Sequence, residues 1–286
     1  MPLPDLPLGL APADVDPLIA RALEEDLGEA GDITCAAVIP ADVRFIGVMA
    51  ARQELVVAGL PLAARVFARL SRDIAFLPEM EDGEKAAPGA VLARIEGPAG
   101  ALLAAERVAL NLLQHLSGIA TETRRYVEEI AGTGCVLLDT RKTIPGLRKV
   151  EKYATRMGGA SNHRMGLYDA ILIKDNHLAV TGSVAEAVRR ARAAGHRQVE
   201  VECDTLEQVR EAVAVGVERI LLDNMDPPML REALKITQGK AQTEASGGIT
   251  LETIRAVAAT GVDFVSVGRI TQSAPAVDIG LDWQAE

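Results

Sequence analysis

One pattern recurs between residues 134 and 270 and limits the folds open to this chain. Each repeat begins with a short apolar run typical of a buried strand, continues with a polar cluster, and ends in an amphipathic helix. The predicted strands cover residues 135–138, 170–173, 199–201, 220–222, 242–245 and 264–267. Strict alternation of strand and helix, joined by right-handed crossovers, predicts a parallel sheet.

Such a sheet is either an open doubly wound sheet or a barrel. The glycine-rich dinucleotide motif that would favour the first is absent after the first strand, and six strands are fewer than the eight of a complete barrel. Ser183, Thr205 and Asp226 are predicted caps of the intervening helices. We therefore expect an α/β fold with an incomplete six-stranded parallel barrel.

The first hundred residues follow a different pattern. A predicted helix at about 17–27 precedes strand-like segments at 45–50 and 55–57, and residues 83–97 carry two further strand signals between glycines. This last stretch is similar to a lipoyl-type hairpin, but no lysine stands at its turn, which favours a structural role. A long helix at about 101–130 follows, with Gly118 as a candidate break.

The overall charge excludes several classes of partner. The chain carries 30 Lys and Arg against 40 Asp and Glu, a net charge of −10, which argues against nucleic-acid and membrane-surface binding. Cys35, Cys135 and Cys203 stand far apart and match no zinc spacing, so neither a disulfide framework nor a structural metal is expected. No apolar run approaches the roughly 20 residues that span a bilayer, and no signal peptide is recognisable. We expect a cytoplasmic protein.

Polar residues concentrate where the predicted strands end, the edge of a parallel barrel at which catalytic side chains converge. Any one of them could simply be solvated, but their concentration predicts a binding site. The set comprises Asp139, Arg141, Lys142, Asn162, His163, Arg164, Lys174, Asp175, Asn176, His177, Glu200, Glu202, Asp204, Asp223 and Asn224.

The last two strands end differently, in Ser246-Gly247-Gly248 and Gly268-Arg269. Glycine lets backbone N–H groups approach a phosphate closely, and barrel enzymes commonly build phosphate sites at these two loops. Nearby carboxylates suit ribose hydroxyls and Mg²⁺, whereas the basic residues suit carboxylates or a pyrophosphate. The predicted ligands are a phosphorylated sugar and an anionic small molecule.

Three further residues stand apart from this cluster. Arg107 shares a helical stripe with Leu103 and Leu110, where an unpaired charge would be costly, so it requires an anionic partner. The sequence suggests no acidic or cationic partner for His115 or His196, and both are interpreted as structural or surface residues.

Long strings of the sequence closely resemble the quinolinate phosphoribosyltransferase family. Three of them carry most of the likeness: LDTRKTIPGLR at 138–148, EKYA at 151–154 and NHRMGLYD at 162–169. Shorter matches lie at 31–34, 106–111, 172–177, 221–225 and 246–249, so the resemblance extends over nearly the whole chain.

The resemblance implies a fold and a reaction. The fold is an open-faced α/β sandwich at residues 1–116, on which the tail 271–286 packs, followed by the incomplete barrel at 117–270. The reaction transfers the phosphoribosyl group of phosphoribosyl pyrophosphate (PRPP) to quinolinate with Mg²⁺. It releases pyrophosphate and CO₂ and gives nicotinate mononucleotide, a step of de novo NAD biosynthesis. The family forms homodimers, and whether the dimers assemble further is left open.

The resemblance also assigns roles to individual residues. Lys142, Glu202 and Asp223 would be catalytic, with Lys142 between the two substrates and the carboxylates facing ribose and Mg²⁺. Arg107 would act across the dimer interface. The substrate-binding set would be Arg107, Thr140, Arg141, Lys142, His163, Arg164, Lys174, Glu202, Asp223, Ser246, Gly247, Gly248, Gly268 and Arg269.

Two positions depart from the family pattern. Ala160 stands where a third glycine is expected, and Arg269 stands where a small residue commonly follows Gly268. Arg269 either adds a phosphate contact or turns outward. Two alternatives to the enzyme remain: a non-catalytic sensor of a phosphorylated metabolite, and a molybdenum-associated relative, which we expect to lack the full Asn162-His163-Arg164 cluster.

Overall fold

The computed structural model describes residues 5–7 and 9–285, which form two compact units. The first unit contains the chain up to Arg124, Thr143–Gly159 and the segment from Ser273 onward. The second contains Arg125–Lys142 and Ala160–Gln272. None of the described helices is long and apolar enough to cross a membrane.

The second unit is built on a six-stranded parallel sheet in the order β6-β11-β10-β9-β8-β7. β6 and β7 are the first two strands of this unit along the chain, yet they stand at the two ends of the order. The barrel therefore stays incomplete, as predicted. The strands are β6 (Val136–Leu138), β7 (Ile171–Ile173), β8 (Val199–Cys203), β9 (Arg219–Asp223), β10 (Gln242–Ser246) and β11 (Phe264–Ser266).

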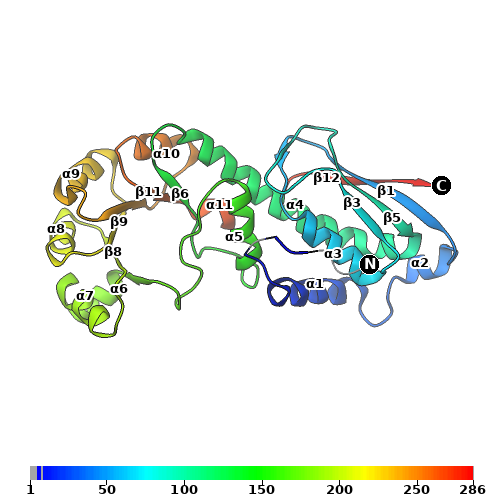
Figure 1. The fold of residues 1–286 in the computed structure, drawn as a ribbon, viewed down its shortest axis with the longest axis horizontal. Helices are drawn as coiled ribbons and strands as arrows, with labels where there is room; N and C mark the ends of the chain where they lie inside the picture. Colours follow the sequence, from blue (N-terminus) through cyan, green and yellow to red (C-terminus); the bar gives the residue numbers. More distant parts are fainter. Residues whose placement is uncertain (1–4, 8, 286) are drawn as a thin grey trace. The chain divides into compact units, whose positions relative to one another are not determined.

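Helices follow these strands and surround the sheet (Figure 1). The predicted caps are confirmed, because the side chains of Ser183, Thr205 and Asp226 each accept a hydrogen bond from the backbone N–H three residues on. The helices are α6 (Asp175–Thr181), α7 (Val184–Ala193), α8 (Leu206–Val215), α9 (Pro227–Thr237), α10 (Leu251–Ala258) and α11 (Arg269–Gln272).

The first unit combines a four-stranded antiparallel sheet, in the order β12-β1-β5-β3, with helices that share its apolar core (Figure 1). β2 and β4 form a separate two-stranded ladder. The elements are α1 (Pro12–Leu27), α2 (Ile33–Val38), β1 (Arg44–Ala51), β2 (Leu55–Val56), α3 (Leu60–Leu70), β3 (Ala75–Pro78), β4 (Lys85–Ala86), β5 (Val91–Pro98), α5 (Arg148–Met157) and β12 (Ile279–Ala285).

The long helix α4 (Ala99–Glu129) is continuous, so the candidate break at Gly118 is not observed. A Cβ atom at this position would lie 2.2 Å from the carbonyl oxygen of Pro275. Glycine is therefore needed here because the chain at 275–276 passes close to the helix, and its usual helix-weakening effect is outweighed by packing.

Candidate active site

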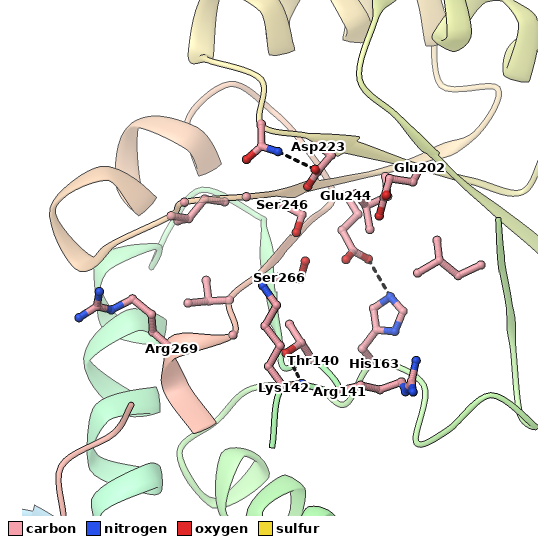
Figure 2. A pocket seen from close by; sticks show the side chains of 18 of the residues that line it. Thr140, Arg141, Lys142, His163, Glu202, Asp223, Glu244, Ser246, Ser266 and Arg269 are labelled. Carbon is pink, nitrogen blue, oxygen red and sulfur yellow. Dashed lines mark hydrogen bonds and ion pairs between the residues drawn. The ribbon is translucent and has the colours of Figure 1, made fainter. Parts of the chain in front are cut away.

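A pocket of about 730 Å³ opens at the carboxyl ends of the parallel strands, entirely within the second unit (Figure 2). Thirteen of the fourteen predicted substrate-binding residues line it. They are Thr140, Arg141, Lys142, His163, Arg164, Lys174, Glu202, Asp223, Ser246, Gly247, Gly248, Gly268 and Arg269.

Arg107 is the exception, since it lies on α4 in the first unit and does not line this pocket. The expectation that its charge sits on a buried apolar stripe is not met. Leu110 is buried, but Arg107 itself is exposed, so no desolvation cost arises within one chain.

The backbone around Lys142, just after β6, is fixed by two threonines. The Lys142 N–H donates to Thr140 Oγ1 at 3.0 Å, and its carbonyl accepts a hydrogen bond from the buried Thr271 hydroxyl at 2.7 Å. A Cβ atom at Gly268 would lie 2.8 Å from Lys142 Cδ. Gly268 therefore makes room for the lysine stem, a reason for glycine that differs from the predicted close approach to phosphate.

Asp139 holds the loop that carries His163 and Arg164. This fully buried carboxylate accepts hydrogen bonds from Asn162 Nδ2 at 2.5 Å and from the His163 backbone N–H at 2.9 Å. The loop after α5 is thereby tied to the end of β6, and Leu138 and Ser161 form an isolated parallel bridge beside it. The cations of two sequence segments are brought to one wall of the pocket.

These cations crowd one another. Burial lowers the pKa of Arg164, and the nearby charge of Arg141 lowers it further. Lys174, at the end of β7, forms an ion pair with Glu202 on β8. A pocket wall that accumulates positive charge in this way favours an anionic ligand.

His163 lies against two carboxylates inside the barrel. Its Nε2 is 3.3 Å from Glu200 Oε2 and 3.5 Å from Glu244 Oε2, and the latter contact is drawn in Figure 2. Burial lowers the pKa of His163, but the hydrogen bonds to the two carboxylates outweigh it and raise the pKa to about 9. Arg219 lies 3.6 Å from Glu244 and adds a second positive charge.

The side chains of His163, Glu200 and Glu244 are close enough together to hold a metal ion, because their ligand atoms lie within 4.8 Å of one another. The proton on His163 argues against it. Nδ1 accepts a hydrogen bond from the Arg164 N–H at 2.8 Å, so the neutral ring carries its proton on Nε2, and the charged ring does so as well. Nε2 faces the carboxylates as a donor, which fits an ion pair rather than a metal site.

Asp223 ends β9 and lies across the pocket from Lys142 and Arg141 (Figure 2). Burial and the charge of Asp204 raise its pKa, whereas Lys174 and Lys142 oppose that shift. Oxygen donors of this kind suit Mg²⁺, which binds through one or two carboxylates together with substrate phosphates. Since Glu202 is already paired with Lys174, Asp223 fits the ion better.

The predicted phosphate loop follows β10. Gly247 and Gly248 both have positive φ, 95° and 61°, which non-glycine residues rarely adopt. Arg269 is exposed, and Figure 2 shows its side chain extending away from Lys142. Arg269 nevertheless lines the pocket, so its contact with phosphate stays a prediction.

Two residue interpretations from the sequence need correction. His115 was expected to lack acidic company, but its Nε2 lies 3.0 Å from Oε1 of the fully buried Glu151 on α5, so that expectation is wrong. His196 is exposed, as expected. Glu244 was assigned to a strand and missed as a pocket residue, although Glu244 and Ser246, two residues apart on that strand, share one face.

Fold and pocket together define a class of protein: an α/β-barrel enzyme for anionic, phosphorylated small molecules. Residues 32–117 match the family model of the quinolinate phosphoribosyl transferase N-terminal domain, and residues 119–282 match that of the C-terminal domain. The chain belongs to the quinolinate phosphoribosyltransferase family.

Individual relatives agree with this assignment. A probable nicotinate-nucleotide pyrophosphorylase (carboxylating) of Bacillus subtilis is 45% identical over 260 residues, which is 90% of this chain and 89% of the relative. A mitochondrial quinolinate phosphoribosyltransferase (decarboxylating) of Nicotiana glauca is 39% identical and covers 96% and 83%. The NadC crystal structure from Streptococcus pyogenes superimposes with a TM-score of 0.92 at 38% identity, over 97% of this chain and all of that one (100%).

Proposed function

We propose that this chain transfers the phosphoribosyl group of PRPP to quinolinate and releases pyrophosphate and CO₂, which yields nicotinate mononucleotide for NAD biosynthesis. The observation that carries the proposal is that one and the same pocket has a cationic wall facing carboxylates and a glycine-rich loop. Pure anion capture needs only the cations, whereas a glycosyl transfer also needs negative charge beside the ribose.

The cationic wall suits quinolinate, which carries two carboxylates. Arg141, Arg164 and Lys174 would pair with them, and His163 in its charged form would add a fourth cation. Holding the ring in this way presents its nitrogen to the anomeric carbon of PRPP, and such orientation lowers the barrier by avoiding a loss of entropy at the reaction step.

The opposite wall suits PRPP. Pyrophosphate departure leaves an oxocarbenium-like ribose, which Glu202 and Asp223 would stabilise electrostatically, while Lys142 would neutralise the leaving group. Ser246, Gly247 and Gly248 would bind phosphate. Mg²⁺, held through Asp223 with Glu202 nearby, would supply further positive charge to the pyrophosphate.

Decarboxylation then follows from the substrate itself. Attack by the ring nitrogen makes it a positively charged electron sink, so the C–C bond to the adjacent carboxylate can break, release CO₂ and leave its electron pair on the ring carbon. That carbon then takes up a proton from water to give nicotinate mononucleotide. No protein nucleophile is required for this step.

We further propose a homodimer in which Arg107 of the partner subunit completes the quinolinate site. The support is that Arg107 is exposed on α4 and does not line the pocket of its own chain. A cytoplasmic location is also proposed. It agrees with the free state of Cys35, Cys135 and Cys203.

A direct assay tests the proposed reaction. Quinolinate labelled in the carboxylate next to the ring nitrogen is incubated with the protein, PRPP and Mg²⁺, and CO₂ and pyrophosphate are both measured. We expect equal amounts of the two products, each dependent on PRPP. Tight binding of both substrates without product would instead identify a non-catalytic sensor.

A further inference from the structure

We infer that Asn224 is a positioning residue that fixes the Asp223 carboxylate and the spacing between the loops after β9 and β10. The inference rests on the proposed function, because it concerns the PRPP side of that reaction. Asn224 lines the pocket, yet no substrate or metal role has been assigned to it above.

The backbone of Asn224 has an uncommon conformation. Its φ is 54°, in the left-handed region, and among the described non-glycine residues only Asn224 and Gln238 have positive φ. Gln238 is explained by its place as the C-cap of α9, where this conformation is common. Asn224 follows a strand instead. Asparagine adopts this region more readily than most residues, and its local hydrogen bonds select the conformation here.

Two hydrogen bonds impose it. The Asn224 N–H donates to the Ser246 carbonyl at 2.9 Å and continues the pairing of β9 with β10 beyond Asp223 and Ser246. The side-chain Nδ2 donates to Asp223 Oδ2 at 2.6 Å, the bond drawn to Asp223 in Figure 2. A short bond from an amide to a carboxylate is a strong contact of its type.

The other end of the same amide reaches the phosphate loop. A Cβ atom at Gly247 would lie 2.2 Å from Asn224 Oδ1 and 2.7 Å from Cγ, so the asparagine side chain occupies the space that any larger residue at 247 would need. One side chain therefore lies between the proposed ribose carboxylate and the proposed phosphate loop and contacts both.

The consequence for Asp223 is a defined orientation. Its Oδ2 is held by Asn224, which leaves Oδ1 for ribose or Mg²⁺. Lys174 and Lys142 both attract this carboxylate, so without the amide Asp223 would be drawn toward the lysines and away from its proposed ligands.

The test is Asn224→Gly, which keeps the left-handed backbone accessible and removes the side chain that carries the amide. We expect kcat/KM for PRPP to fall about tenfold or more and more Mg²⁺ to be needed for half-maximal rate, whereas the Kd of quinolinate stays within about twofold. Gln238→Gly is the matched control, because it places glycine at the other positive φ and should leave rate and Mg²⁺ dependence unchanged.

A double mutant separates positioning from a direct role. If Asn224 acts through Asp223, then Asn224→Gly should add little to the loss already caused by Asp223→Asn. Full activity of Asn224→Gly would overturn the inference but not the proposed function. So would a loss in the Asp223→Asn background as large as the loss that Asn224→Gly causes in the wild-type protein. An inactive wild-type protein would overturn the proposed function, and the inference with it.

Discussion

At the scale of single residues, the pocket depends on charges that compensate one another inside the barrel. Glu244 is fully buried and Glu200 nearly so, and their partners are His163 and Arg219. A buried charge is tolerated only when it is paired, and removing one member leaves the others uncompensated. Charge balance therefore predicts that His163 is protonated in the folded protein.

The pH dependence of His163 follows from its pKa of about 9, raised from 6.5. We expect the ring to be charged at pH 7. The protonated Nδ1 then no longer accepts a hydrogen bond from the Arg164 N–H, and the attraction of two buried carboxylates outweighs the loss of that bond. A raised pKa means that its stabilising contribution is complete below pH 6.5 and is lost as pH rises through about 9. NMR titration is practical, since the chain has only 4 histidines, and His163→Asn assigns the signal. Titration near pH 6.5 would contradict the ion pair.

Gly268→Ala probes the space beside Lys142. The new methyl group would lie 2.8 Å from Lys142 Cδ, and the flexible stem should move aside. We therefore expect kcat to fall on the order of tenfold while the free energy of unfolding changes by less than about 1 kcal/mol. Steady-state kinetics and thermal unfolding measure the two effects. Unchanged kcat would show that the lysine does not need its present position.

At the scale of helices and strands, the sequence predicted all six barrel strands to within one or two residues, because buried parallel strands are short apolar runs between clear helix caps. It did not predict α2 (Ile33–Val38), a helix with no buried residue whose only signal is the capping Asp32. It also missed Glu244, since apolar residues usually fill a barrel and a carboxylate inside one needs partners from distant strands.

The ends of β8 and β9 place Glu202 and Asp223 on the proposed PRPP side. Substitutions there should therefore lower the reaction rate without weakening the binding of quinolinate. We expect Asp223→Asn to lower kcat by about 100-fold or more and Glu202→Gln by a smaller factor, with quinolinate Kd nearly unchanged. Calorimetric titration and initial rates over a range of Mg²⁺ concentrations measure both quantities. Full activity with normal Mg²⁺ dependence in either variant would remove that carboxylate from the mechanism.

At the scale of the whole molecule, the sequence identified thirteen pocket residues, because loops of a barrel meet at one edge whatever their separation along the chain. Ten of them lie within the matching strings, and Glu202, Gly268 and Arg269 were found as residues at strand ends. Arg107 could not be placed by the same reasoning. Exposure depends on tertiary packing, and the helical stripe with Leu103 and Leu110 gave no sign that Arg107 faces solvent.

The proposed exchange of Arg107 between subunits predicts complementation. Arg107→Ala and Lys142→Ala should each be nearly inactive as homodimers. In a mixed dimer one pocket combines the intact Lys142 of one chain with the intact Arg107 of the other, so up to half of the wild-type activity per heterodimer should return. Native mass spectrometry confirms the exchange. Confirmed mixed dimers without restored activity would show that Arg107 serves no neighbouring site.

The central claim is that the cationic wall of this pocket is built for two carboxylates. The direct measurement is kcat/KM of the wild-type protein for quinolinate and for nicotinate, which lacks one of them, with PRPP and Mg²⁺ held constant. Nicotinate would bring one carboxylate fewer to the wall formed by Arg141, Arg164 and Lys174, and the loss of those charge-assisted contacts should cost on the order of 2 to 5 kcal/mol. We therefore predict that quinolinate is used at least about 30-fold more efficiently. Comparable efficiency with nicotinate would contradict the account.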